Sequence, residues 1–306
     1  MLAMSFPQPA VVKRLAAKDS RFRIATSAFT LAELLVVIAV VAILATLLVA
    51  ALNEAKSKGH SIACLSQERQ LIVAWHVYAD ENEGRVARNY GISRTLQTIA
   101  DGTYQNWVNN VLDWSTDPMN TNRTLLFAGG IGPYLSQQHE VYRCPSDSVV
   151  SPQQSSLGWR SRVRSYSMNA MVGDAGEFTT QGFNTNNPAY QQFFALTEIP
   201  QPSDIFVFIE EHPDSLRDGY FLNNAYSFQW KDLPASYHSG GANLVFADGH
   251  AEYQRWKVGS TRVPARPLAF EPDGRLEGAD QRDFSWLMQH TSIRRNPPTT
   301  TPTPGY

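Results

Sequence analysis

Cysteine is scarce in this sequence, which has only Cys64 and Cys144 among its 306 residues. The two lie far apart and lack the close pair spacing of zinc-binding motifs, so the spacing indicates no metal site. Several catalytic signatures are missing as well: there is no G-x-S-x-G, no H-E-x-x-H and no glycine-rich phosphate loop. We therefore expect that the chain is not an enzyme.

Charge and proline are missing from one long stretch near the N-terminus. No charged residue occurs from Leu34 to Leu52, and no proline occurs between Pro9 and Pro118. A helix of about 20 apolar residues spans the roughly 30 Å hydrocarbon core of a membrane. Because nothing interrupts the pattern after the apolar run, we predict one helix of about 50 residues that ends with Gly84 as its C-terminal cap.

Basic residues are concentrated before the apolar run. The segment up to Ala28 has five basic residues and one acidic residue, which leaves 21 of the 26 basic and 27 of the 28 acidic residues for the rest. By the positive-inside rule this leader stays in the cytoplasm and the C-terminal bulk lies outside. The exported part is mildly acidic, so we expect no nucleic-acid partner.

The junction of the leader with the apolar run reads Ala28-Phe29-Thr30-Leu31-Ala32-Glu33. It resembles the processing site of type IV pilins and type II secretion pseudopilins, although that family prefers Gly where this chain has Ala28. The resemblance implies cleavage between Ala28 and Phe29 by a prepilin peptidase, N-methylation of Phe29 and a role for Glu33 in assembly.

Glu33 separates this interpretation from a plainer one, an uncleaved signal anchor that holds an exported domain. A carboxylate near the end of a membrane helix is costly when unpaired, so it usually marks function. In a filament Glu33 could pair with the Phe29 ammonium of a neighbouring subunit, whereas a simple anchor gains nothing from it.

A second resemblance covers the C-terminal part of the chain. His238, nine further residues and Asp248-Gly249 resemble the signature of the prepilin-type "H-X9-DG" group. Other matching pieces, in chain order, are Cys64-Leu65, Cys144-Pro145-Ser146-Asp147, Ser165-Tyr166-Ser167-Met168-Asn169 and Pro202-Ser203-Asp204. The group name describes co-occurrence with the processing site and implies no activity.

Asp248-Gly249 also predicts a β-hairpin over residues 242–254, because Asp-Gly between two extended runs favours a two-residue turn. That turn pairs Phe246 with Ala251 and Leu244 with Tyr253, which gives one apolar face. His238, Asp248 and His250 are residue types that suit a metal. We favour a structural role, in which Asp248 occupies the turn and His238 locks it, and we assign no metal.

Oxygen-rich loops that could hold calcium occur at Asp80–Glu83 and Asp273–Asp283, but neither follows an EF-hand pattern and neither is assigned. Glu210, Glu211 and His212 could supply paired carboxylates and a base for a hydrolase. We favour a solvated strand end for them. Cys64 and Cys144 could form a disulfide in an oxidising compartment, or could remain two buried thiols.

We predict an α+β, pilin-like fold in which a long N-terminal helix, transmembrane in its first half, packs on a head with an antiparallel sheet. Strands are expected at 140–144, 164–169 and 205–209, and a closing helix at 281–290. The predicted segments are a cytoplasmic leader (1–28), a membrane or filament-core helix (29–52), its amphipathic continuation (53–84), a periplasmic head (85–295) and a disordered Pro/Thr-rich tail (296–306).

The function implied by the resemblance is that of a structural subunit anchored once in the bacterial inner membrane and assembled into a type II secretion or type IV pilus-like filament. Its implied partners are the prepilin peptidase, an inner-membrane assembly platform, other subunits and membrane lipid. Two alternatives remain. One is an anchored binding module, for example for glycans, using the aromatic residues Trp107, Trp114, Trp159 and Trp230, and the other is the anchored hydrolase.

Overall fold

The computed structural model describes residues 30–180, 182–268 and 275–295. The chain divides into two compact units, residues 1–50 and 51–306, and helix α1 contributes to both. The predicted leader 1–28, the predicted processing site at Ala28 and Phe29, and the predicted tail 296–306 lie outside the described residues. The α-helices are α1 (Leu31–Glu81), α2 (Ile92–Ala100), α3 (Arg123–Phe127), α4 (Pro152–Ser156) and α5 (Gln281–Gln289). Short 3₁₀ helices are Pro118–Asn120, Gly132–Leu135, His139–Tyr142, Gly176–Phe178, Leu196–Glu198, Gly259–Thr261 and Gly278–Asp280.

The long N-terminal helix is confirmed as α1, which runs for 51 residues, or about 75 Å at the standard rise. It starts with a capping box: Thr30 Oγ1 accepts from the Glu33 backbone N–H at 3.2 Å, and Glu33 Oε2 accepts from the Thr30 N–H at 2.9 Å. It ends where the Gly84 N–H bonds the Ala79 carbonyl at 2.9 Å, with Gly84 at φ +78°. The predicted cap is therefore correct.

The described part of the first unit is the apolar part of α1 up to Ala50. Its large apolar side chains, from Leu31 to Val49, are 49–77 % exposed. By length and composition the helix could cross a membrane.

The second unit contains a five-stranded sheet in the order β5-β1-β4-β6-β7. Its strands are β1 (Tyr166–Asn169), β4 (Phe206–Glu210), β5 (Tyr220–Phe221), β6 (Gly241–Phe246) and β7 (Ala251–Arg255), and β2 (Thr179–Thr180) pairs separately with β3 (Phe183–Asn184). The run 205–209 is the central strand, as predicted. An antiparallel sheet was expected, but the sheet is mixed: β1 pairs in parallel with β5, whereas its other pairings are antiparallel.

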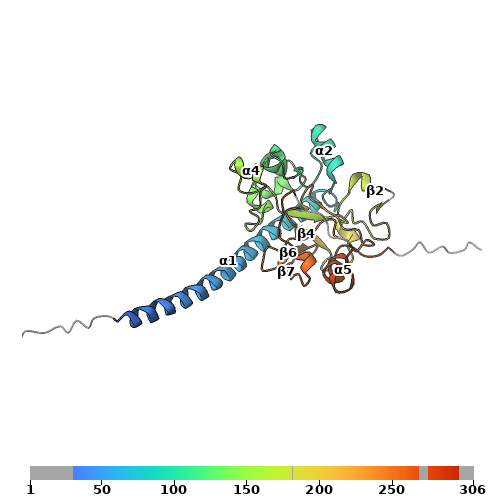
Figure 1. The fold of residues 1–306 in the computed structure, drawn as a ribbon. Helices are drawn as coiled ribbons and strands as arrows, with labels where there is room; N and C mark the ends of the chain where they lie inside the picture. The colour runs from blue at the N-terminus through green and yellow to red at the C-terminus, as the bar shows by residue number, and fades with distance from the viewer. Residues whose placement is uncertain (1–29, 181, 269–274, 296–306) are drawn as a thin grey trace, which may run out of the picture. The chain divides into compact units, whose positions relative to one another are not determined.

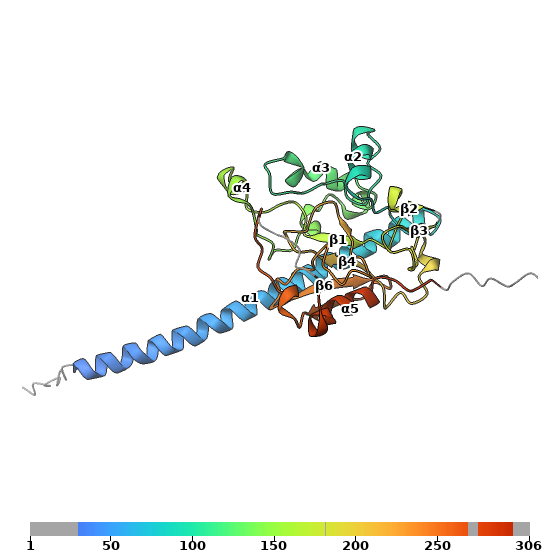
Figure 2. The ribbon, with the colours of Figure 1, turned by 45° about the vertical axis from the view of Figure 1, so that its right-hand side comes forward.

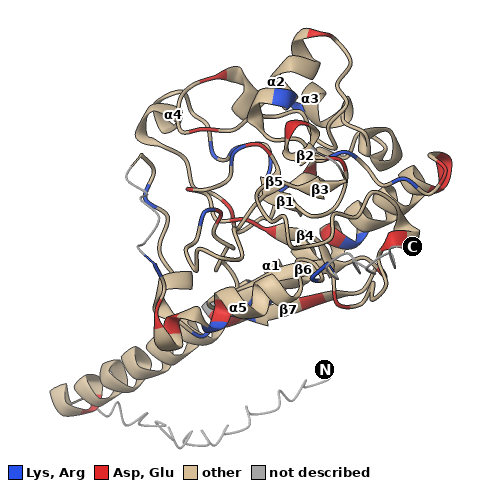
Figure 3. Ribbon diagram, turned by 90° about the vertical axis from the view of Figure 1, so that its right-hand side faces the viewer, with Lys and Arg blue, Asp and Glu red and all other residues tan. Residues whose placement is uncertain are grey.

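Two apolar cores cover the two faces of this sheet. On one face α1, through Leu71, Ile72 and Trp75, packs with Tyr166 and Phe208. On the other face α5, through Phe284, Leu287 and Met288, packs with residues of β4 and β6. Helices α2, α3 and α4 lie on the opposite side of the sheet from α5 (Figures 1 and 2). Acidic and basic residues are interspersed over this unit (Figure 3).

The predicted hairpin exists, but its register is wrong by one residue. Val245 lies opposite Ala251, and Leu244 lies opposite Glu252. The turn has three residues instead of two: the Gly249 N–H bonds the Phe246 carbonyl, and the Phe246 N–H bonds the His250 carbonyl, both at 2.9 Å. Gly249 takes φ +92°, which is the left-handed position of a type I turn with a bulge.

The expected strand at 140–144 is also wrong, because His139–Tyr142 is a 3₁₀ helix. Burial explains the apolar residues that suggested a strand here: Val141 and Tyr142 both lie in the core on the α1 side of the sheet. Cys144 follows this turn directly and is buried as well.

Candidate functional site

Four buried side chains with metal-ligand chemistry meet between α1 and the sheet. Cys64 comes from α1, Cys144 from the segment after His139–Tyr142, Glu210 from the end of β4 and His238 from the segment before β6. One ligand atom from each lies within 4.8 Å of the others. We call these four residues the buried tetrad. Its members come from four separate segments, so only the tertiary fold brings them together.

His238 is the centre of the tetrad. Its Nε2 lies 2.9 Å from Glu210 Oε1 and 3.4 Å from Cys144 Sγ. The Asn243 N–H donates to the other Glu210 oxygen, Oε2, at 2.8 Å. The Tyr253 hydroxyl donates to the His238 backbone carbonyl. These contacts orient the Glu210 carboxylate and the His238 ring toward the two cysteines.

In the structure Cys64 and Cys144 form a disulfide, with their Cα atoms 5.3 Å apart. The bond joins α1 to the chain segment that leads toward β1. Nearby, His60 Nδ1 lies 3.0 Å from Ser146 Oγ, and Ser61 Oγ donates to Asn243 Oδ1 at 3.1 Å. Polar side chains therefore line this part of the helix–sheet junction on both sides of the cysteines.

Glu68 adds a second carboxyl group to the same junction. It lies one helical turn after Cys64, is fully buried, and neither of its oxygens has a hydrogen-bond partner within the described part of the chain. Burial, reinforced by the negative charge of Glu210, raises the pKa of Glu68 well above its usual range. Both effects favour the protonated, uncharged form of Glu68.

Comparison with known proteins does not assign this site. No protein-family model, curated protein or solved structure matches the chain.

The two ends of the H-X9-DG signature do not meet. The strand β6 lies between His238 and Asp248, so they occupy opposite ends of it, and the expected lock of His238 on the turn is wrong. The turn is held instead by His76 of α1, whose Nε2 lies 2.9 Å from the Ala247 carbonyl. Asp248 Oδ1 accepts from the His250 N–H at 3.0 Å and lies 2.6 Å from its Nδ1.

The acidic cluster after β4 is neither a solvated strand end nor one paired site. Glu210, Glu211 and His212 are all at most 2 % exposed. Glu210 belongs to the tetrad, whereas Glu211 accepts from the Ser167 hydroxyl. Burial raises the pKa of Glu211 to about 7, although the Ser167 hydrogen bond and the Arg164 charge act in the opposite direction. The two carboxylates considered for the alternative hydrolase site thus have different partners.

Two of the four tryptophans proposed as a binding surface are buried. Trp107 is buried in the core on the α1 side, and its Nε1 donates to the Gly219 carbonyl at 3.1 Å. Trp230 is buried in the other core, against Phe284. Trp114 is half-buried and stacks with the Arg162 guanidinium, 4.0 Å from the ring centre. Trp159 is partly exposed as well. Only Trp107 and Trp230 are therefore excluded from a glycan-binding surface by their burial.

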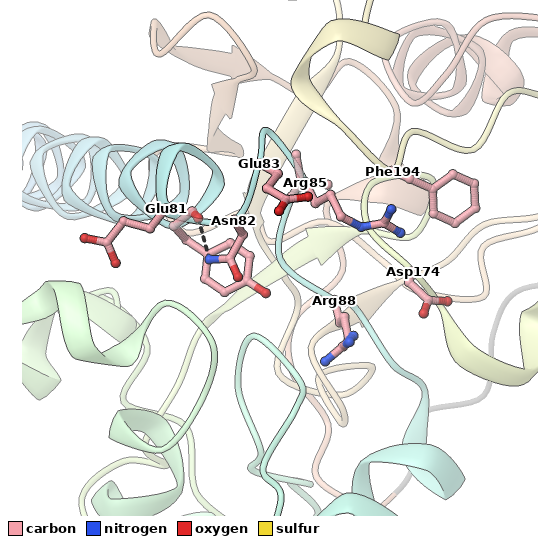
Figure 4. A pocket seen from close by; sticks show the side chains of 9 residues that line it. Glu81, Asn82, Glu83, Arg85, Arg88, Asp174 and Phe194 are labelled. Carbon is pink, nitrogen blue, oxygen red and sulfur yellow. Dashed lines mark hydrogen bonds between the residues drawn. The ribbon is translucent and has the colours of Figure 1, made fainter.

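A separate cavity of about 330 Å³ lies beside the C-terminal end of α1. Its charged lining residues carry both signs: Glu81, Glu83 and Asp174, with Arg85 and Arg88. Figure 4 shows Arg85 extending toward Phe194 on the cavity wall. Two guanidinium groups beside the acids disfavour the calcium site considered for Asp80–Glu83. Part of the other loop, 273–283, lies outside the described residues.

Sequence reasoning missed the tetrad although it singled out all its members. The two cysteines, the acidic strand end and the histidine were treated separately, because none of them shares a short spacing with another. The signal that could have joined them was the order of the motif pieces, since Cys64, Cys144 and His238 all belong to the set that resembles the H-X9-DG group.

Proposed function

We propose that this chain is a pilin-like structural subunit, cleaved by a prepilin peptidase before Phe29 and assembled through its N-terminal helix into a type II secretion or type IV pilus-like filament. Its implied partners are the peptidase, an inner-membrane assembly platform, membrane lipid and further subunits. In this arrangement the head, residues 85–295, lies outside the membrane.

The observation that carries this proposal is the apolar part of α1. Within the described chain its large side chains are half exposed or more, from Leu31 to Leu52, so the protein itself does not cover them. Such a surface requires lipid or other apolar helices. An ordinary anchor satisfies this requirement too, so the distinction between the two depends on Glu33.

Glu33 has a local role that the experiment must separate from assembly. It completes the capping box with Thr30, and glutamine can take the same place in such a box. Glu33→Gln therefore keeps the helix start and removes the charge, whereas Glu33→Ala removes both. If the charge pairs with the amine of a neighbouring Phe29, both variants fail to enter filaments.

The test compares the full chain in a host with an active prepilin peptidase and in the same host without it. N-terminal sequencing should find an N-methylated Phe29 only in the first host. Sheared filament fractions should contain the unmodified sequence and lack both Glu33 variants. A mature chain that still begins upstream of Ala28 would refute the proposal. Normal incorporation of Glu33→Gln into filaments would show that Glu33 acts only in the capping box and that its charge has no role in assembly.

A further inference from the structure

We propose that the buried tetrad is a metal site: when its cysteines are reduced, Cys64 Sγ, Cys144 Sγ, His238 Nε2 and Glu210 Oε1 bind one zinc-class divalent ion. The disulfide and the metal are then alternative ways to close the same junction between α1 and the sheet. This inference concerns the head alone and does not depend on filament assembly.

The ligand chemistry selects the class of metal. Thiolate and imidazole ligands favour zinc and similar ions over calcium and magnesium, which take oxygen ligands. A set of two sulfurs, one ring nitrogen and one carboxylate oxygen is a four-coordinate donor set that suits zinc. Because all four residues are at most 2 % exposed, the site is closed, as is typical of structural zinc.

One ligand distance already fits this coordination, and the others must increase. Zinc bonds of about 2.0–2.3 Å place neighbouring tetrahedral ligands about 3.3–3.8 Å apart. His238 Nε2 and Cys144 Sγ are already 3.4 Å apart. The 2.9 Å separation between His238 and Glu210 must open by a few tenths of an ångström, and the bonded sulfurs must separate.

The surroundings hold two of the ligands in place. The Asn243 N–H binds Glu210 Oε2 and leaves Oε1 directed at the site. The Tyr253 hydroxyl fixes the backbone of His238. Such outer contacts orient metal ligands and raise affinity. Glu68, buried one turn after Cys64 and with both oxygens unpartnered in the described part of the chain, is a further unsatisfied polar group at this junction.

Charge also permits the exchange. Two neutral thiols give up two protons to solvent as two zinc–sulfur bonds form, so one divalent cation replaces two protons. The proton between His238 Nε2 and Glu210 Oε1 moves to His238 Nδ1, which has no partner in the described part of the chain. The net charge of the buried site does not change, and no additional charge is moved into the low-dielectric interior. Reduction itself is balanced by the reagent: a phosphine becomes its oxide with oxygen from water, and the disulfide gains two electrons and two protons.

The test uses the full chain in detergent, oxidised or reduced with a water-soluble phosphine, and titrated with Co²⁺ and then Zn²⁺. The reduced chain should bind one Co²⁺ with sulfur-to-cobalt charge-transfer absorption and visible bands of a tetrahedral site. Zn²⁺ should displace it, and each bound ion should release two protons. The oxidised chain, which has the same sequence, should bind none.

Variants identify the ligands. His238→Ala should weaken binding at least about tenfold, because loss of even an outer contact costs about 10–100-fold in metal affinity. The matched control is His250→Ala at the exposed hairpin turn, which should bind as the unmodified chain does. The proposal is overturned if the reduced chain, with both thiols verified by labelling, gives no charge-transfer band. It is also overturned if the oxidised chain binds equally, or if His238→Ala leaves the affinity unchanged.

Discussion

Reduction of the Cys64–Cys144 bond should lower the free energy of unfolding of the head by about 4.5 kcal/mol. The bond closes a loop across a sequence separation of 80 residues. In the chain-entropy relation, a loop of this length removes about 15 cal/mol/K from the unfolded ensemble, which is about 4.5 kcal/mol at 25 °C. The loss comes from the unfolded state, so the folded head should keep its secondary structure after reduction.

The assay is urea unfolding of the full chain in mild detergent with a metal chelator present, with and without phosphine. All seven tryptophans follow residue 51, so their fluorescence reports only on the second unit. With a slope of about 3 kcal/mol/M, the midpoint should fall by about 1.5 M urea. The variant with both cysteines changed to alanine should unfold at one midpoint regardless of phosphine.

The reasoning is refuted if the reduced chain, with two labelled thiols per molecule, unfolds at the same midpoint as the oxidised chain. A lower midpoint with a proportionally steeper slope would also refute it, because the stability in water, which is the product of the two, would then be unchanged.

Two further predictions concern a buried acid and a buried glycine. The pKa of the Glu68 carboxyl is raised above its ordinary 4.5 in the folded chain, so the unfolded chain loses the carboxyl proton first as pH rises. The free energy of unfolding therefore falls by up to about 1.4 kcal/mol per pH unit until Glu68 also ionises in the folded chain. Glu68→Gln should therefore gain stability relative to the unmodified chain between pH 5 and neutrality, and a constant difference across that range in urea titrations would contradict this. Gly173 has φ +87°, and an added Cβ would lie 2.2 Å from the Ala87 carbonyl oxygen, so Gly173→Ala should cost about 3 kcal/mol or more. Gly158→Ala, at φ +78° with nothing within 4 Å, should cost only about 1–2 kcal/mol in the same assay, and equal losses would exclude the steric argument.

Those parts of the fold that depend on local pattern could be predicted from the sequence. The uninterrupted apolar run and the absence of proline were sufficient for α1, and the continuous apolar content of 205–209 was sufficient for the central strand β4. The closing helix expected at 281–290, around an apolar and aromatic cluster, appears as α5. In each case the residues that identify the element all lie within the element itself.

The predictions from the sequence were wrong where contacts between distant parts of the chain determine the structure. The hairpin register depends on one extra turn residue, and the buried face on each side of β6 belongs to a different core. A strand buried on both faces does not show the polar and apolar alternation from which a register can be chosen. The buried tetrad was not predicted for a related reason. Its residues come from segments far apart in the sequence, between Cys64 and His238, and no spacing rule connects them.

The position of the disulfide also determines how the head resists tension. Cys64 precedes Leu71, Ile72 and Trp75 along α1, and these residues form the apolar contact of the helix with the sheet. A force drawn along the helix from its N-terminal side therefore meets a covalent link before it reaches that packed interface. In the oxidised head the disulfide carries such a force, so α1 stays attached to the sheet. In the reduced, metal-free head only side-chain packing and hydrogen bonds oppose separation of α1 from the sheet.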